Sequence, residues 1–138
     1  MKYLLDTGFA VALLNRQDHR HLEVVPVRQK IQGEIYFPVP AITETSYLLA
    51  RDIGIELAAD FIASLPYTDL LLVNPLPNDY QRAAELMRQY ADAELDFVDS
   101  IIVAIAERLN ITRILTLDQR DFRLVRPRHC AAFEILPD

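Results

Sequence analysis

The chain has only one cysteine, Cys130, among its 138 residues. A single thiol cannot form a disulfide within the chain and cannot build a cysteine-based metal site. The three histidines, His19, His21 and His129, lack the spacing of metal ligands relative to one another and are expected at the surface. Any metal bound by this chain would therefore be held mainly by oxygen ligands.

Long apolar runs are also missing. The longest, residues 9–14 and 101–106, are far shorter than the roughly 20 residues that a membrane-spanning helix needs. A signal peptide is not expected either, because Asp6 interrupts the first apolar stretch and charged residues follow it before any cleavage-like pattern. The sequence therefore predicts a cytoplasmic protein without a membrane segment.

Positive charge is scarce as well. Fourteen Lys and Arg residues stand against 20 Asp and Glu, which gives a net charge of −6 and a pI near 5.0. Taken alone, this balance argues against a protein that binds polyanions. A hydrophobic fraction of 51% is typical of a globular chain, and the length fits one domain over residues 1–138.

Short apolar runs suited to strands alternate with amphipathic or apolar helical segments. Strands are expected at residues 3–5, 35–37, 70–73, 113–117 and 133–135, the last at a sheet edge. Helices are expected at residues 9–14, 22–31, 41–53, 55–65, 79–90 and 97–109. This alternation predicts an α/β sandwich around a mostly parallel sheet.

Two of the predicted strands end in an aspartate. Asp6 follows residues 3–5, and Asp118 follows residues 114–117. In open parallel sheets ligands bind beyond the carboxyl ends of the strands, so two carboxylates on one such edge indicate a site. The alternative is that each aspartate only opens a turn or caps the next helix.

Asp99 lies on an apolar face of the predicted helix at residues 97–109. Its neighbours one and two turns along that face are Ile102, Val103 and Ala106. A carboxylate there needs a partner, because an unpaired buried charge is costly. Alternatively, Asp96 caps the helix and Asp99 occupies its third position, favoured by the helix dipole; both interpretations can hold together.

Glu44 is a fourth candidate, one turn into the helix that follows Pro40. A solvated first-turn glutamate is the commoner explanation of such a residue. Converging carboxylates without cysteine are nevertheless what Mg²⁺ or Mn²⁺ requires. Such a cation lowers the pKa of bound water and neutralises charge on a phosphoryl group.

Hydroxyl and acidic side chains flank the strand-end aspartates. Thr7 and Thr116 could bond to a metal-bound water or be ordinary strand-end hydroxyls, and Ser100 is equally ambiguous. Asp121 could support Asp118, but the segment Asp-Gln-Arg-Asp also suits a plain turn, which we favour.

Four short motifs occur in a characteristic order. They are Leu-Leu-Asp-Thr at 4–7, Thr-Glu at 43–44, Leu-Asp-Phe-Val-Asp-Ser at 95–100 before an alanine-containing helix, and Ile-Leu-Thr-Leu-Asp-Gln-Arg-Asp-Phe at 114–122. Together they resemble the PIN-domain signature, with the order and spacing of VapC-type ribonuclease toxins over about the whole chain.

The resemblance implies a three-layer α/β/α sandwich and an RNA endonuclease that depends on Mg²⁺ or Mn²⁺. Its acidic quartet would be Asp6, Glu44, Asp99 and Asp118, with the three aspartates on the metal and Glu44 holding metal or positioning water. Asp96 also fits the motif region, but the burial argument and the family pattern agree on Asp99.

Partners are implied in the same way. The resemblance implies a type II toxin–antitoxin pair, with an antitoxin that places a basic side chain in the acidic pocket, and a homodimer. The helices at residues 41–65 carry more large apolar side chains than one core-facing stripe needs. The additional ones could form the dimer face, although core packing explains them nearly as well; they are Tyr47, Leu48, Ile55 and Phe61.

Most of the basic residues are arginine, and several gather in the last quarter of the chain. Arginine suits bidentate contact with phosphate better than lysine does. These residues could form an RNA-backbone rim beside the acidic pocket, or a solvated surface that balances nearby acids. They are Arg113, Arg120, Arg123, Arg126 and Arg128.

Two other functions compete with the nuclease. A non-catalytic PIN-like module would use the acids only to bind a basic partner, but its expected mark, a missing quartet member, is absent. A phosphoaspartate receiver or phosphatase needs a paired acid and a lysine, whereas Asp6 is followed by Thr7 and Gly8 and the only lysines, Lys2 and Lys30, follow no expected strand.

The quartet accounts for four of the six net negative charges. A bound divalent cation would offset two of them, so an acidic chain can still take an RNA substrate. RNA binding is then expected to depend on the metal and on the arginine-rich last quarter.

Overall fold

A computed structural model describes all 138 residues as a five-stranded sheet between two layers of helices. The strands are β1 (Lys2–Leu5), β2 (Glu34–Pro38), β3 (Leu71–Val73), β4 (Arg113–Leu115) and β5 (Glu134–Leu136). The helices are α1 (Thr7–Leu14), α2 (His21–Lys30), α3 (Val39–Asp52), α4 (Ile55–Ser64), α5 (Pro77–Gln89), α6 (Phe97–Leu109) and α7 (Gln119–Leu124), with short 3-10 turns η1 (Leu65–Tyr67) and η2 (Ala91–Ala93).

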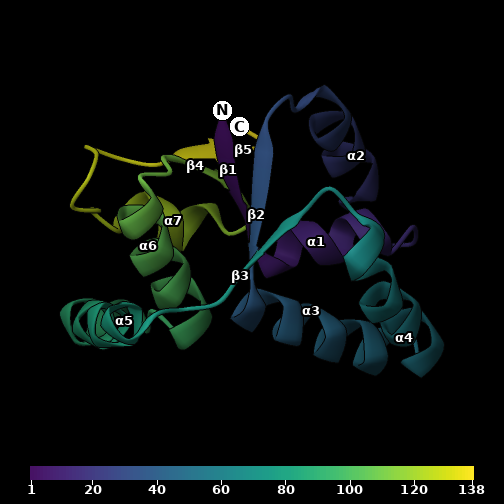
Figure 1. The fold of residues 1–138 in the computed structure, drawn as a ribbon, viewed down its shortest axis with the longest axis horizontal. Coiled ribbons are helices and arrows are strands. Elements are labelled where there is room, and N and C mark those ends of the chain that lie inside the picture. The colour runs from purple at the N-terminus through teal and green to yellow at the C-terminus, as the bar shows by residue number, and fades with distance from the viewer.

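The sheet has the strand order β3-β2-β1-β4-β5, and every neighbouring pair is parallel. Figure 1 shows α1 and α2 on one side of the strands and α6 and α7 on the other. Helix α3 packs against both α1 and α4, whereas α5 packs against α6. The predicted α/β/α sandwich with a parallel sheet is therefore confirmed, and β5 is an edge strand as expected.

The core is densest around β1, β4 and α6. Every residue from Asp99 to Ala106 is buried, which confirms the prediction of an enclosed helix. An apolar helix packed on both flanks stabilises the fold by removing its side chains from water. No helix in the structure is long and apolar enough to cross a membrane.

The expected strands and all six expected helices exist, with ends that shift by a few residues. One helix was not predicted: residues 119–124 form α7, where we favoured a plain turn. The predicted dimer residues also separate, because Phe61 is buried in the core while Tyr47 and Ile55 are exposed and Leu48 is half-buried.

Candidate metal centre

The carboxyl ends of β1 and β4 lie side by side, as predicted. The two strands pair in parallel with Leu5 opposite Leu115, and the Asp6 amide continues the ladder by donating to the Leu115 carbonyl at 2.9 Å. Asp6 therefore leaves the sheet next to Thr116. Asp118, two residues further on, lies at the same edge.

Asp6 is buried, and both of its carboxylate oxygens accept hydrogen bonds from the protein. The Thr7 amide donates to Oδ1 at 2.7 Å, and the Thr116 hydroxyl donates to Oδ2 at 2.6 Å. Burial raises the pKa of Asp6 to about 6, and the charges of Asp118 and Glu44 add to the rise, while the two hydrogen bonds oppose it. Asp6 is thus held rigidly in an environment that is already negative.

Helix α6 brings Asp99 to the same edge. Its first turn is capped by Asp96, whose carboxylate accepts from the Asp99 amide at 2.9 Å. The Asp96 side chain is exposed, whereas Asp99 is only 7% exposed. Burial raises the pKa of Asp99 well above its usual range, and the charges of Asp6, Asp96 and Asp118 raise it further. Both sequence interpretations therefore hold: Asp96 is the cap, and Asp99 is a buried acid among other acids.

Helix α7 adds a carboxylate that the sequence interpretation placed in a turn. Asp118 is the N-cap of α7 and accepts from the Asp121 amide at 3.2 Å, while its own amide donates to the Thr116 hydroxyl at 2.9 Å. This cap directs Asp121 back to the strand edge. One carboxylate oxygen each from Asp99, Asp118 and Asp121 lies within 4.8 Å of the others. The turn prediction at Asp121 is wrong, and its side chain joins the cluster.

The donor set of this cluster suits a hard divalent cation. All of its ligand atoms are carboxylate oxygens, which Mg²⁺ and Mn²⁺ prefer. Asp121 Oδ1 is buried without a hydrogen-bond partner, and Arg120 Nε lies 4.0 Å from it, beyond hydrogen-bonding distance. Burial and the Asp118 charge raise the pKa of Asp121. Arg120 therefore offsets the charge of Asp121 only weakly, and no other basic side chain pairs with the acids of this cluster.

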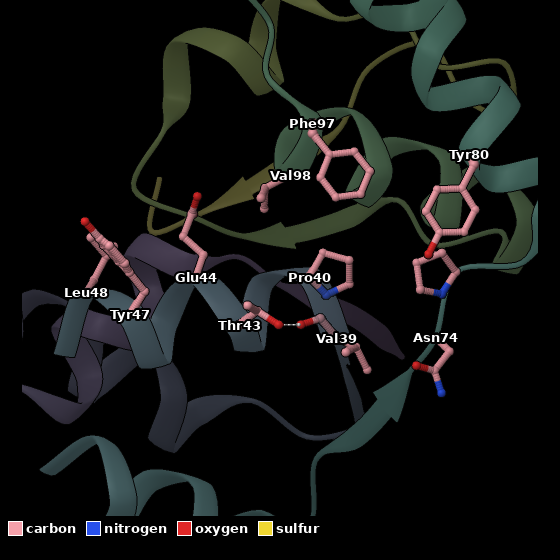
Figure 2. A pocket seen from close by; sticks show the side chains of 11 residues that line it. Val39, Pro40, Thr43, Glu44, Tyr47, Leu48, Asn74, Tyr80, Phe97 and Val98 are labelled. Carbon is pink, nitrogen blue, oxygen red and sulfur yellow. Dashed lines mark hydrogen bonds between the residues drawn. The ribbon is translucent and has the colours of Figure 1, made fainter. Parts of the chain in front are cut away.

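Glu44 lies on α3 at the border of a hollow beside this cluster. The hollow has a volume of about 680 Å³, and we call it the aromatic groove; its walls include Val39, Pro40, Tyr47, Asn74, Tyr80 and Phe97. Figure 2 shows Glu44 extending from α3 toward the start of α6. Glu44 is half-buried, and its charge acts on Asp6. All four acids of the predicted quartet thus interact electrostatically.

The hydroxyl groups near the acids have different surroundings. Thr116 connects Asp6 with the Asp118 backbone. The Thr7 hydroxyl donates to the Ala41 carbonyl at 3.5 Å and so connects the start of α1 with α3. Ser100 Oγ is buried and has no hydrogen-bond partner. Of the three, only Thr116 bonds directly to an acidic side chain.

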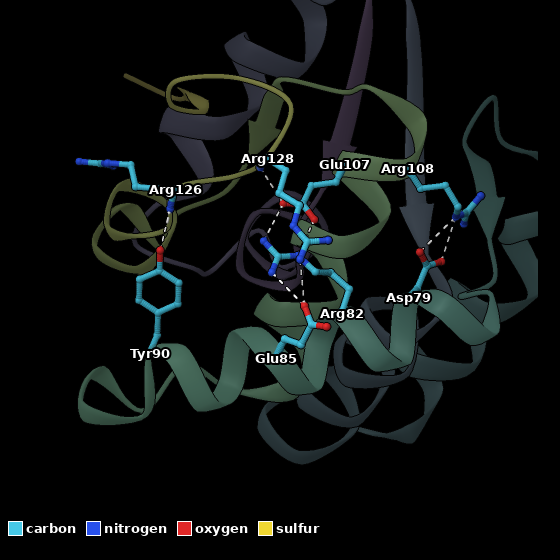
Figure 3. Close-up of polar contacts among 8 residues, drawn as sticks. All are labelled: Asp79, Arg82, Glu85, Tyr90, Glu107, Arg108, Arg126 and Arg128. Carbon is cyan, nitrogen blue, oxygen red and sulfur yellow. Dashed lines mark hydrogen bonds and ion pairs between the residues drawn. The ribbon is translucent and has the colours of Figure 1, made fainter.

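Two of the five predicted RNA-contacting arginines lie away from this edge. Arg113 is the first residue of β4, at the amino end of the sheet, and its Nε lies 3.0 Å from Glu134 Oε2. Arg128 is bound to the outer face of α5 and α6, where its amide donates to Glu107 at 2.8 Å and its guanidinium donates to Glu85 at 3.1 Å (Figure 3). Glu107 is eight residues after Asp99, about 12 Å along the helix. Arg113 and Arg128 therefore do not form part of a basic rim beside the acidic cluster.

The other three arginines are on or just after α7. Arg120 is in its first turn, with a side chain 76% exposed. Arg123 Nη2 lies 3.9 Å from Asp138 Oδ1, and the Arg126 guanidinium donates to the Arg123 carbonyl at 2.7 Å. Of the five, Arg120 is the one adjacent in sequence to the carboxylate cluster.

Comparison with known proteins adds independent findings. The PIN domain family model matches residues 3–126. The chain is 24% identical over 134 residues to ribonuclease VapC26 from Mycobacterium tuberculosis, covering 97% of this chain and 99% of that protein. The crystal structure of Mycobacterium tuberculosis VapC20, a sarcin–ricin loop cleaving toxin, matches with a TM-score of 0.77 at 23% identity over 81% of this chain and 86% of that one. VapBC2 from Rickettsia felis, bound to a promoter DNA fragment, matches with a TM-score of 0.70 at 16% identity over 98% of both chains.

Proposed function

This chain belongs to the PIN-domain family, and we propose that it is a VapC-type ribonuclease that hydrolyses RNA phosphodiester bonds with Mg²⁺ or Mn²⁺. The whole of residues 1–138 would form one such domain. Three carboxylates with oxygens within 4.8 Å of one another, none of them neutralised by a bonded basic side chain, are the observation that carries the proposal.

We propose a separate role for each acidic side chain of the site. Asp99 and Asp118 would hold the cation, with Asp6 beside them and Asp121 as a further oxygen ligand. Glu44, at the border of the aromatic groove, would help to hold metal or position the attacking water. A bound divalent cation would lower the pKa of a water molecule and neutralise charge on the phosphoryl group. The Thr116 hydroxyl, 2.6 Å from Asp6 Oδ2, would fix the orientation of that carboxylate.

Proton release accompanies metal loading in this proposal. The raised pKa values of Asp6 and Asp99 mean that the metal-free site retains protons near neutral pH. A cation must displace those protons, so its affinity rises with pH. The same carboxylates would attract a basic side chain from an antitoxin, which is the partner that we propose. We also propose a homodimer, which the exposed Ile55 side chain on α4, outside the aromatic groove, would suit.

Cleavage of a structured RNA by the purified protein tests the proposal. We expect cutting with Mn²⁺ or Mg²⁺, and none in EDTA. Asp99→Asn and Asp118→Asn should abolish cutting while the circular dichroism spectrum is unchanged. Asp60→Asn, at an exposed acid on α4, is the matched control and should cut like the wild type.

Two results would overturn the proposal. Full activity in Asp99→Asn would remove this cluster from the reaction. Calorimetry that detects no divalent cation at millimolar concentration would instead favour a non-catalytic module in which the acids only bind a basic partner.

A further inference from the structure

The aromatic groove holds two large side chains that the core does not use. Tyr80, near the start of α5, is 52% exposed, and Phe97, the first residue of α6, is 39% exposed. Large exposed aromatic side chains gathered in one hollow commonly mark a binding surface. The groove is therefore a candidate site beyond the carboxylate cluster.

The two rings are parallel and stacked with an offset. Their planes differ by only 6°, with centroids 6.3 Å apart. Figure 2 shows the Phe97 ring above Pro40 and the Tyr80 ring beside it. A planar group that packs on the exposed face of either ring would extend this parallel stack, an arrangement that aromatic rings favour.

The groove borders the proposed reaction centre through Glu44, which is part of its wall and close enough to Asp6 for their charges to interact. A substrate whose phosphodiester lies at the carboxylates would therefore extend a neighbouring unit into the groove.

The charge of the groove indicates which unit that is. Among its eleven wall residues Glu44 is the only charged one, and no lysine or arginine is present. Such a surface repels a phosphate but accepts an uncharged planar ring.

We propose that Tyr80 and Phe97 form a stacking platform for an unpaired base of the RNA next to the cleaved bond. The proposal rests on the proposed ribonuclease function and adds residues that determine which RNA is cut. Single-stranded bases are recognised in this way, by stacking on aromatic side chains.

Steady-state cleavage of an oligoribonucleotide by the Mn²⁺-loaded protein is the first test. The double variant Tyr80→Leu/Phe97→Leu keeps apolar side chains but loses both aromatic faces. We expect its KM to rise roughly 5- to 150-fold for one stacked base, with kcat near that of the wild type. Tyr80→Phe should retain the wild-type KM. Tyr67→Leu, at an 88% exposed tyrosine outside the groove, is the control for loss of an aromatic ring.

A spectroscopic readout separates this proposal from the nuclease assignment. RNA carrying 2-aminopurine next to the cleaved bond should lose fluorescence on rapid mixing with the wild type, before cleavage, but not with the double variant. If the wild type quenches the probe yet cuts no RNA, the platform stands and the ribonuclease proposal fails.

Other occupants of the groove would give different results. If a second copy of the chain or a peptide covers it, the double variant will change only the association state and will keep the wild-type KM and quenching. That outcome overturns the platform, as does an equal rise of KM in Tyr67→Leu.

Discussion

Raising the pH from 5 to 8 should destabilise the metal-free protein. Burial moves the pKa of Asp6 from 3.8 to about 6 on folding. The folded state therefore binds this proton more tightly than the unfolded state, so stability is greatest at low pH and is lost as the pH rises through the folded pKa. Over the whole titration of Asp6 the free energy of unfolding falls by about 3 kcal/mol, and roughly half of this fall lies between pH 5 and pH 8.

The other buried acid acts in the same direction. The pKa of Asp99 is also raised, by burial and by the charges around it, so its deprotonation extends the loss above pH 6. Paired acids with a lowered pKa, such as Glu107, stabilise the folded state as the pH rises. That gain in stability is present above the unfolded pKa of 4.5 and is largely complete at pH 5. The loss of stability expected between pH 5 and pH 8 therefore comes from the raised pKa values of the cluster.

Urea unfolding in EDTA at these two pH values measures the effect. Asp6→Asn removes the titrating group, so we expect a smaller loss between pH 5 and pH 8 and higher stability than the wild type at pH 8. Asp60→Asn should keep the wild-type pH dependence, and Mn²⁺ should restore stability at pH 8 because it binds the folded state. A metal-free stability that stays constant or rises over this window would refute the reasoning, as would an undiminished loss in Asp6→Asn.

Replacing Thr116 by valine removes the hydroxyl that donates to Asp6 Oδ2, so the pKa of Asp6 rises further and calorimetry should show weaker Mn²⁺ binding; unchanged affinity would contradict a positioning role for this bond. Glu107→Ala removes the closer of the two carboxylate partners of the Arg82 guanidinium and leaves Glu85 at 3.3 Å, which costs about 1–3 kcal/mol. The thermal midpoint by circular dichroism should therefore fall while Mn²⁺ affinity holds, and an unchanged midpoint would mean that the ion pair contributes little. Arg120→Ala should weaken RNA binding in a low-salt filter assay, whereas Arg113→Ala, at the opposite end of the sheet, should not; equal losses would favour the continuous basic rim.

The parts of the site that could be predicted follow from strand direction and helix periodicity. Asp6 and Asp118 each follow a short apolar strand, and the parallel pairing of β1 with β4 brings them to one edge. Asp99 stands out because its helical neighbours are apolar, and the structure confirms that it is buried. These inferences need only local pattern and one topological rule.

The support of Asp118 by Asp121 was ranked below a plain turn, because α7 has only six residues and no apolar stripe. A signal was present, since Asp118 and Asp121 have the spacing of a helix cap and the third helical position. The position of Arg113 could likewise have been predicted, because a residue at the start of a parallel strand lies opposite the carboxyl edge.

Other features depend on tertiary packing and could not be predicted from local pattern. Tyr80 and Phe97 meet because α5 packs against α6. Arg128 is bound by Glu85 and Glu107 from two different helices. Neither arrangement leaves a periodic trace in the sequence, since each depends on how separate elements lie in space.

The central claim is that the carboxylates at the ends of β1 and β4, together with Asp99 and Asp121, bind a divalent cation. Anomalous diffraction from a crystal grown with Mn²⁺ tests it most directly. The account predicts an anomalous peak within bonding distance of Asp99, Asp118 and Asp121 oxygens, and no such peak in crystals of Asp99→Asn. A well-ordered site without a peak, or Mn²⁺ bound only elsewhere on the chain, would contradict it.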